Sequence, residues 1–335
     1  MRFGKIDHYL LLGGGKLLGE LAITLTKQEK KITVVTSPRH VNEILPDIGI
    51  TLATLLNKNK IPYISLSNLN NKIIDEIITP TTLGISIGAA WIFKSSFIRK
   101  FNSRLINLHG SKLPQDRGGG GFSWRILRKD RQGFNLIHLI DDGVDTGDIV
   151  YYEEYVFPAF CRISLDFQKF STNQYLKFIG SFIKKIEKNN EFKHISQTEY
   201  FSSYWPRLAT NKHAYIDWSW TLFDIESFIC AFDDPYPGAM TFLNGKLVRI
   251  KDCYCITTDG KFHPFQTGII YRINSNSLFV ACNEGSLIIN KLVDKNNKPI
   301  LDRVILGDRF YTPGKLLEQA MQTREYYSAS GIKKG

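Results

Sequence analysis

Short apolar runs alternate with longer amphipathic stretches through roughly the first 200 residues of the chain. The short runs are rich in branched residues and predict buried strands, whereas the longer stretches repeat their apolar residues with helical spacing. The predicted strands are residues 9–12, 31–36, 61–65, 83–88, 105–109, 135–139 and 148–155, of which the last two are compatible with an antiparallel edge pair. The predicted helices are residues 16–27, 52–57, 71–78, 122–128 and 165–188. This alternation predicts an α/β domain with a mostly parallel sheet and helices on both faces.

The pattern changes after Gln197. Residues 200–220 are rich in aromatic and polar side chains and are typical of a linker, and one helix is expected over residues 222–231. Short strands then recur between turn signals such as Asn244-Gly245, Asp259-Gly260 and Glu284-Gly285, which predicts a small β-barrel or sandwich. We therefore expect a first domain over residues 1–205, a second over 206–305 and a tail over 306–335.

The chain is basic, because its 335 residues include 43 Lys and Arg against 32 Asp and Glu, a formal charge of +11. Such a charge suits an anionic partner, either nucleic acid or a phosphorylated small molecule. The lysines are scattered, however, so solubility explains the charge equally well. The five cysteines show no disulfide or metal-site spacing, and no apolar run is long enough to span a bilayer. We expect a cytoplasmic protein without a membrane partner.

A glycine-rich turn follows the first predicted strand, where Gly13, Gly14 and Gly15 precede Lys16. Bare backbone at the start of a helix lets a pyrophosphate approach closely, as in dinucleotide-binding turns. No acidic residue ends the second strand, which disfavours NAD. A phosphate site for another nucleotide and a tight turn without a ligand both remain open.

Two polar residues, Asn107 and His109, end an otherwise apolar predicted strand. Side chains in a strand alternate between its faces, so these two point the same way. Open α/β sheets bind ligands at the carboxyl ends of their strands. An amide and an imidazole there could hydrogen-bond one developing oxyanion, and this is more consistent with function than with two unrelated structural polar groups.

An acidic loop follows, with Asp141, Asp142, Asp145 and Asp148 separated by Gly143 and Gly147. A carboxylate from this loop beside His109 would orient the imidazole and raise its pKa. Asp-rich loops with glycine also bind Ca²⁺, but this one has no Glu at the twelfth position. A plain acidic turn is the third interpretation.

Together these segments resemble the folate-dependent formyltransferase family. The family's Asn-x-His strand matches Asn107 and His109, and its Asp-x-Gly loop matches Asp145 and Gly147. Its Ser-x-Leu-Pro-x-x-Arg-Gly loop matches Ser111, Leu113, Pro114, Arg117 and Gly118. Residues 216–218 and 234–239 resemble the junction into an OB-like C-terminal domain.

The resemblance implies a Rossmann-like catalytic domain and a smaller OB-like β-barrel, with N10-formyltetrahydrofolate as co-substrate and no metal. Asn107 and His109 would stabilise the tetrahedral oxyanion, while Asp145 would hold His109 and accept a proton from the attacking amine. The pterin would lie against Ala89, Ala90, Trp91, Ile92, Phe93, Ile140, Asp141, Asp142 and Val144. The expected acceptor-binding residues are Gly13, Gly14, Gly15, Lys16, Ser111, Arg117, Gly118, Trp205 and Tyr236.

The acceptor expected from the sequence is an amino sugar linked to dTDP, UDP or GDP, for surface polysaccharide or O-antigen. By resemblance, members of the tRNA branch of the family carry a basic cluster after the second strand. Residues 37–43 contain no such cluster. Methionyl-tRNA formyltransferase is the alternative enzyme, and an OB-type nucleic-acid-binding protein is the alternative without catalysis. The edges of the second domain could also pair in a homodimer.

Overall fold

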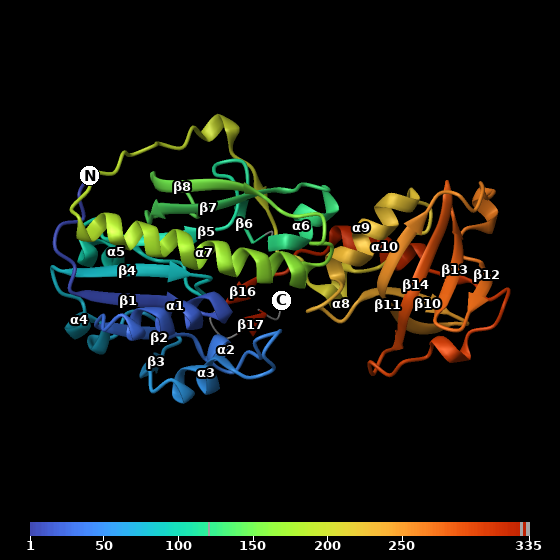
Figure 1. Cartoon of the computed structure of the whole chain (residues 1–335), viewed down its shortest axis with the longest axis horizontal. Coiled ribbons are helices and arrows are strands. Elements are labelled where there is room, and N and C mark those ends of the chain that lie inside the picture. The colour runs from blue at the N-terminus through green and yellow to red at the C-terminus, as the bar shows by residue number, and fades with distance from the viewer. Residues whose placement is uncertain (120, 329–330, 333–335) are drawn as a thin grey trace.

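The computed structural model describes residues 1–119, 121–328 and 331–332. It has two regions that lie end to end, with the termini of the described chain near the first (Figure 1). A seven-stranded sheet of order β3-β2-β1-β4-β5-β7-β8 forms the first region. Its parallel strands are β1 (His8–Gly13), β2 (Ile32–Thr36), β3 (Tyr63–Ser65), β4 (Thr82–Ile87) and β5 (Leu105–His109). Strands β7 (Gln132–Leu139) and β8 (Ile149–Val156) are antiparallel and end the sheet.

Helices cover both faces of this sheet, as predicted. Successive residues of β1 belong to different cores: Tyr9 and Leu11 pack with one set of helices, Leu10 and Leu12 with the other. The first set is α1 (Gly15–Lys27), α3 (Leu52–Lys58) and α7 (Ser164–Glu187), and the second is α4 (Lys72–Ile77), α5 (Ser95–Ile98) and η1 (Arg99–Phe101). A strand that is buried on both faces has a continuous apolar sequence, and this made the strands recognisable.

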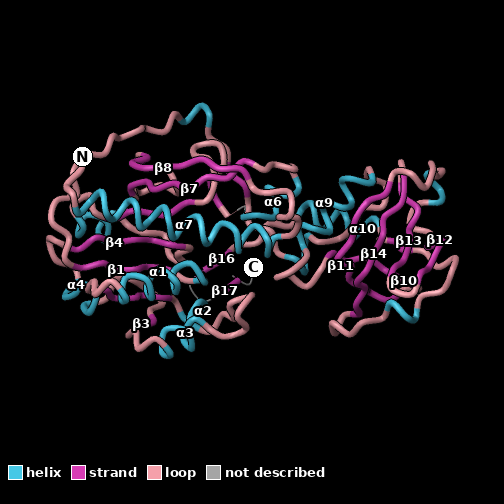
Figure 2. Tube along the Cα trace, viewed as in Figure 1, coloured by secondary structure: helices cyan, strands magenta, loops and turns pink. Residues whose placement is uncertain are grey.

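The second region is built on a six-stranded antiparallel sheet of order β12-β13-β14-β11-β10-β15. Figure 2 shows strands predominating there. The strands are β10 (Ala239–Leu243), β11 (Lys246–Ile256), β12 (Ile270–Asn274), β13 (Ser277–Cys282), β14 (Gly285–Asp294) and β15 (Phe310–Tyr311). A bridge between Ile269 and Arg309 brings the two edges of the sheet together, so it curls into a half-barrel. This agrees with the expected OB-like domain, although β15 lies beyond residue 305.

The remaining elements are short and mostly join or flank the two regions. They are α2 (Pro38–Val41), β6 (Arg117–Gly118), α6 (Gly121–Leu127), η2 (Glu199–Phe201), β9 (Tyr204–Trp205), α8 (Thr210–His213), α9 (Leu222–Phe232), η3 (Pro264–Gln266), η4 (Leu301–Arg303), α10 (Gly314–Gln322), β16 (Tyr327–Ser328) and β17 (Gly331–Ile332). The expected tail therefore contains a helix that packs beside α8, and a strand pair that returns to the first region (Figure 1).

An apolar core joins the two regions. Ile126 of α6 and Phe167 of α7 belong to the same buried cluster as Ile229 of α9. The hydroxyl groups of Ser123 and Ser164 both donate to the Ala231 carbonyl, at 2.8 and 3.0 Å. These contacts hold the linker and α9 at a fixed place beside the carboxyl ends of the parallel strands.

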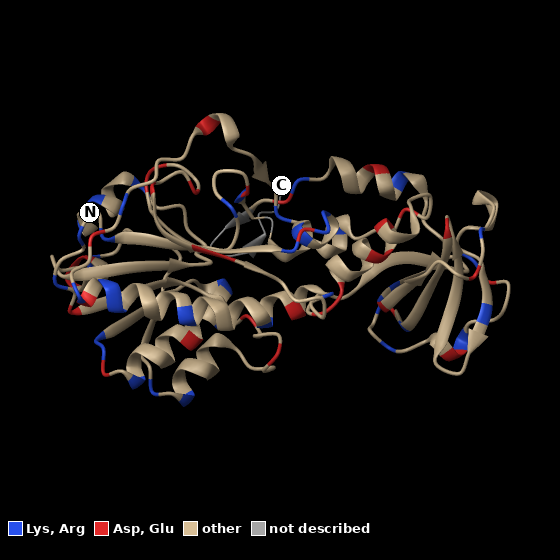
Figure 3. Cartoon of the chain, turned by 45° about the horizontal axis from the view of Figure 1, so that its top comes forward, with Lys and Arg blue, Asp and Glu red and all other residues tan. Residues whose placement is uncertain are grey.

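Basic and acidic residues are interspersed along α7 and the neighbouring elements (Figure 3). This arrangement matches the scattered lysines of the sequence. Within the described part of the chain, no helix combines the length and the apolar character that crossing a bilayer requires.

Replacing Phe182 with Ala should lower the free energy of unfolding by about 3–5 kcal/mol, because Phe182 is fully buried and a cavity would remain. Its ring lies 5.5 Å from that of Phe3 and 5.0 Å from that of Phe192, which anchors α7 to the N-terminal segment. Denaturant unfolding measures the change. Lys184→Ala, on the exposed side of the same helix, is the control. Equal midpoints for both variants would contradict the role of Phe182.

Candidate active site

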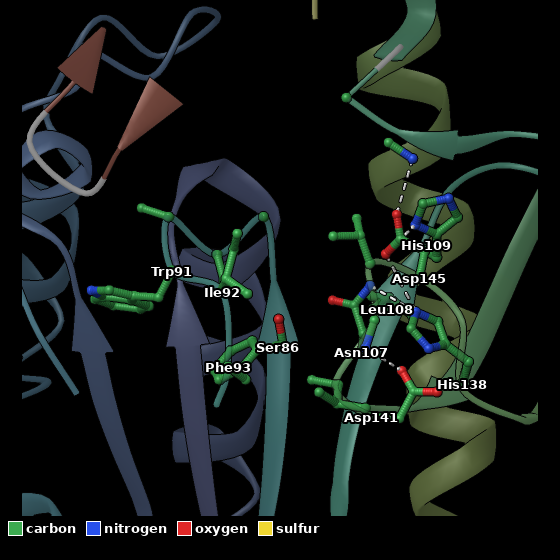
Figure 4. A pocket seen from close by; sticks show the side chains of 18 of the residues that line it. Ser86, Trp91, Ile92, Phe93, Asn107, Leu108, His109, His138, Asp141 and Asp145 are labelled. Carbon is green, nitrogen blue, oxygen red and sulfur yellow. Dashed lines mark hydrogen bonds and ion pairs between the residues drawn. The ribbon is translucent and has the colours of Figure 1, made fainter. Parts of the chain in front are cut away.

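The site is built where three neighbouring strands carry polar side chains. Asn107 on β5 pairs with Ser86 on β4 and with His138 on β7. His109 is the last residue of β5. Figure 4 shows Asn107, His109, His138 and Asp145 together on one side of a pocket. The structure therefore brings together the three residues that the sequence singled out, and adds His138.

The hydrogen bonds of His138 define its tautomer. Its Nδ1 lies 2.7 Å from the Leu139 carbonyl, which can only accept, so Nδ1 carries the proton. Its Nε2 then accepts from the Asn107 amide at 3.1 Å. An amide NH₂ group carries two hydrogens. One of them is used by His138, and the other is available to a ligand in the pocket.

His109 is held from its far side. Its Nε2 lies 2.9 Å from the Ser111 hydroxyl and 3.2 Å from the Asp116 carbonyl. Because the Ser111 hydroxyl itself donates to the Asp116 carbonyl, the proton on His109 belongs on Nε2. The Nδ1 of His109 faces the Asp145 carboxylate at 3.6 Å and can accept a proton. The N–H group of the neutral His109 ring is thus already engaged by Ser111 and Asp116, and not by an oxyanion.

The Asp145 carboxylate lies between both imidazoles. One oxygen is 3.6 Å from His109 Nδ1 and 3.7 Å from His138 Nε2, and the other accepts the Gly118 amide at 3.1 Å. Gln197 donates to the backbone carbonyls of Asp145 and Gly147 at 2.9 and 2.7 Å, which fixes the loop. Asp145 has a φ of +56°, a left-handed conformation that costs energy for a residue with a side chain.

Burial and charge set the protonation of this pair. Burial lowers the pKa of His109, and the Asp145 carboxylate opposes that effect. Burial raises the pKa of Asp145, but the His109 imidazole, the contact with His138 and the Gly118 amide together bring it well below the ordinary carboxyl range. At neutral pH we therefore expect an ionised Asp145 beside a largely neutral His109.

A main cavity of about 470 Å³ opens onto this cluster. The expected pterin residues line it with Asn107, His109 and Asp145; they are Ala89, Ala90, Trp91, Ile92, Phe93, Ile140, Asp141 and Val144. Figure 4 shows Trp91, Ile92 and Phe93 across the pocket, with the Trp91 ring turned away from His109. Asp142 is outside the lining, and its carboxylate accepts the Ser95 hydroxyl.

A side cavity of about 150 Å³ lies behind His109. Four of the expected acceptor residues line it: Ser111, Arg117, Gly118 and Trp205. The Trp205 ring is 5.5 Å from that of Trp124 and beneath the Arg128 guanidinium. Gly118 has a φ of +96°, and a Cβ there would lie 2.7 Å from the Trp205 carbonyl, so only glycine fits.

The glycine-rich turn does not line either cavity. The amide of Gly14 donates to the Ile87 carbonyl, and the His40 ring covers Gly14 so closely that a Cβ would lie 2.3 Å from it. Lys16 pairs with Asp47 at 2.5 Å. Gly13 and Gly15 flank this filled turn, and Tyr236 also lies outside the lining of both cavities, so the acceptor role of all five stays a prediction.

Several residues of the site were not predicted from the sequence. His138 carried a signal, because it is a polar residue in an apolar strand, as Asn107 is. Gln197 had none, since it acts from a loop far along the chain. Arg39, Tyr204 and Arg207 also line the main cavity and bring positive charge and an aromatic ring to it.

One set of described side chains has metal-ligand spacing. Atoms of His109, His138 and Asp145 that could bind a metal all lie within 4.8 Å of one another. The Asn107 amide and the Ser111 hydroxyl already satisfy one nitrogen of each ring. The same arrangement is what proton transfer requires, so these residues need no ion to explain them.

Comparison with known proteins identifies the family. A family model described as formyl transferase matches residues 10–158, and one described as the formyl transferase C-terminal domain matches residues 209–305. The chain belongs to the folate-dependent formyltransferase family. The family resemblance that the motifs indicated is thereby confirmed.

Sequence relatives of this formyltransferase chain include methionyl-tRNA formyltransferases. That of Ruminiclostridium cellulolyticum is 28% identical over 63% of this chain and 66% of its own length. That of Rickettsia africae is 25% identical over 82% of this chain and 88% of its own length. The chain thus spans just under two thirds of the first of these relatives.

Solved structures with the same fold include sugar formyltransferases. WlaRD, a sugar 3N-formyl transferase crystallised with dTDP and 5-N-formyl-THF, has a TM-score of 0.64 at 21% identity, over 87% of this chain and all of that one. The N-formyltransferase of Helicobacter canadensis, crystallised with folinic acid and dTDP-3-aminofucose, has a TM-score of 0.62 at 19% identity, over 85% of this chain and 98% of that one. HypX of Aquifex aeolicus, in complex with tetrahydrofolic acid, has a TM-score of 0.58 at 15% identity, over 97% of this chain and 50% of that one.

Asp145→Asn should reduce kcat for formyl transfer about 10²-fold or more, because it removes the charge that stabilises a proton on His109 while keeping the side-chain size. Steady-state kinetics measures the loss, and Asp148→Asn is the matched control, since Asp148 pairs with His194 at the surface. The assignment would be abandoned if Asp145→Asn kept near-normal turnover with an unchanged fold.

The free energy of unfolding should fall as the pH drops from about 6.5 to about 4 because of His40. Burial, with the charges of Arg39 and Arg207, lowers the pKa of His40 to about 4 from 6.5. Between these values the unfolded chain binds a proton that the folded chain does not, which is worth about 3 kcal/mol in all.

Urea unfolding at about pH 7.5 and about pH 5 measures this slope. His40→Gln should flatten it, whereas His194→Gln, at the surface, should not. An unchanged slope in His40→Gln would show that other groups cause the acid sensitivity.

Proposed function

We propose that this protein transfers the formyl group of N10-formyltetrahydrofolate to the amine of a nucleotide-linked amino sugar. The observation that carries the proposal is the group formed by Asn107, His109, His138 and Asp145 at the wall of the 470 Å³ cavity. An amide donor, a neutral imidazole and a buried carboxylate supply what acyl transfer to an amine needs: an oxyanion donor and a proton acceptor.

The reaction starts with a neutral amine, whose lone pair forms a bond to the formyl carbon. The carbonyl oxygen takes up the negative charge, and the second Asn107 hydrogen, not used by His138, is the donor for it. Removing such a donor typically costs about 2.7–4 kcal/mol of transition-state stabilisation.

The proton of the amine then passes to Asp145 or, beside it, to Nδ1 of His109. Protonating His109 creates an imidazolium next to the carboxylate, which is favourable in a buried site. The bond between the formyl carbon and N10 breaks as the carbonyl re-forms, and N10 takes a proton back. His109 thus acts as the holder of the proton, rather than as the oxyanion donor expected from the sequence.

The proposed co-substrate site is the part of the main cavity lined by residues 89–93 and the loop after β7. The walls there offer apolar side chains for a flat ring and backbone groups for its edge. Structures that share the fold were crystallised with folate compounds, which supports a folate as the co-substrate.

The proposed acceptor is supported by the two arginines of the main cavity, Arg39 and Arg207. Guanidinium groups suit the diphosphate of a nucleotide sugar. WlaRD and the Helicobacter canadensis enzyme, which share the fold, were crystallised with dTDP and a dTDP-amino sugar. Such a product would serve surface polysaccharide synthesis, including O-antigen.

Methionyl-tRNA is the second candidate acceptor, because sequence relatives act on it and the chain is basic. Against it stands the segment after β2. It forms α2 and holds Arg39 and His40 but no cluster of basic residues.

The test is to incubate the protein with N10-formyltetrahydrofolate and either amino sugars linked to dTDP, UDP and GDP or methionyl-tRNA. We expect one of the nucleotide amino sugars to gain the mass of one formyl group, and Asp145→Asn to abolish the gain. A gain only on methionyl-tRNA supports the second candidate, and no gain on any acceptor rejects both.

A further inference from the structure

A large cavity outside the catalytic cluster lies between the two regions. It has a volume of about 580 Å³, within the range of small-molecule sites. We call it the junction cavity. It is lined mainly by aromatic and apolar residues: Trp124, Leu127, Pro206, Leu208, Tyr215, Trp220, Phe228, Phe232, Leu317, Ala320 and Met321. Arg207, His213, Asp217, Asp224, Ser227 and Thr323 are the polar residues of its wall. Around it, α10 packs beside α8 and α9 packs beside α6 (Figure 1).

One wall of the junction cavity comes from α10, which lies beyond residue 305, where the family match ends. None of its residues is buried, although Leu317, Ala320 and Met321 form an apolar stripe that lines the cavity. Met321 is 79% exposed. An apolar helix face against open space, opposite Trp220 and Phe228, is what an apolar or aromatic ligand would cover.

The chain holds α10 in this place. The His213 ring donates from Nε2 to the Thr323 carbonyl at 3.1 Å, directly after the helix. The Arg324 guanidinium then lies over the ring of Tyr204, which lines the main cavity. The segment after β15 therefore runs from the junction cavity to the main cavity.

The junction cavity shares one lining residue with the main cavity and one with the side cavity. Arg207 lines the junction cavity and the main cavity, and Trp124 lines the junction cavity and the side cavity behind His109. The Trp124 indole donates to the Pro206 carbonyl at 2.7 Å, which fixes this part of the linker. A ligand with a flat apolar end, an anionic middle and a polar end could therefore extend from one cavity into the other past Arg207.

We infer that the junction cavity binds the nucleobase of the acceptor, while the diphosphate passes Arg207 and the amino sugar reaches Asp145. This rests on the proposed function, and it names the nucleotide subsite and the part of the chain that forms it. Aromatic walls stack on a base whatever its identity, and a guanidinium suits a diphosphate. The base thus lies among Trp124, Trp220 and α10. Trp205 and Tyr236, which were expected among the acceptor-binding residues, do not line this cavity.

The test uses a pair of variants on neighbouring residues of α10. Ala320→Trp fills the junction cavity, whereas Gln319→Trp places the same ring on an exposed position that does not line it. We expect Ala320→Trp to raise KM for the nucleotide amino sugar about tenfold or more, with kcat within about twofold and KM for the folate unchanged. Gln319→Trp should behave as wild type.

Calorimetric titration with free dTDP, UDP and GDP supplies a second readout that does not depend on turnover. At least one should bind to wild type and to Gln319→Trp, and about tenfold more weakly to Ala320→Trp. Met321→Asp, at a highly exposed position, should weaken binding too, because it makes the wall beside the base polar.

The outcomes separate this inference from the proposed function. If wild type formylates a nucleotide amino sugar and Ala320→Trp keeps its KM and its nucleotide affinity, the inference is wrong and the proposed function stands. If wild type formylates no such sugar but binds a nucleotide, and Ala320→Trp binds that nucleotide more weakly, the proposed acceptor is wrong and the nucleotide site stands. If none of the three nucleotides binds to wild type, the inference is overturned.

Discussion

A carboxylate buried between two imidazoles is the constraint that organises this protein. Asp145 lies less than 4 Å from both His109 and His138, and a buried charge of this kind is tolerated only when its neighbours compensate it. The Gly118 amide donates a hydrogen bond to the carboxylate, and a proton taken up by Nδ1 of His109 would compensate its charge further. Because Asp145 takes a left-handed backbone conformation, the loop also needs the Gln197 hydrogen bonds to keep the carboxylate in place.

The sheet explains why these groups meet. Up to β5 the strands are parallel, but β7 runs antiparallel, which places His138 directly opposite Asn107. The chain leaves β7 beside the start of β5, since Leu139 lies opposite Ile106, and the loop that follows turns back to bring Asp145 to His109. The turn into the antiparallel pair is thus part of the site.

Much of this could be predicted from the sequence because buried strands and strand ends leave local signals. Because side chains two apart in a strand share a face, Asn107 and His109 were predicted to point the same way. The strands of the first region were predicted within a few residues of their observed ends. Cross-strand register leaves no such signal, so nothing in the sequence placed His138, a polar residue in an apolar strand, opposite Asn107. Gln197 and Arg207 act from a linker whose path no local pattern describes. Segment 314–322 was expected only as part of a tail, because its apolar stripe is short and no part of α10 is buried.

The two sides of the site come from different parts of the chain. The proposed folate side uses the ends of β4 and β7, which belong to the rigid sheet, and it adjoins the proton-transfer group directly. The proposed acceptor side is lined by Tyr204 and Arg207 of the linker and by α10, which follows the half-barrel. The hydrogen bonds described for Asn107, His109 and Asp145 come from β7, the loop after β5, Gly118 and Gln197, and none of them comes from α10. The choice of acceptor can therefore vary while the chemistry at the formyl carbon stays the same, and this fits a family whose relatives act on acceptors as different as a tRNA and a sugar.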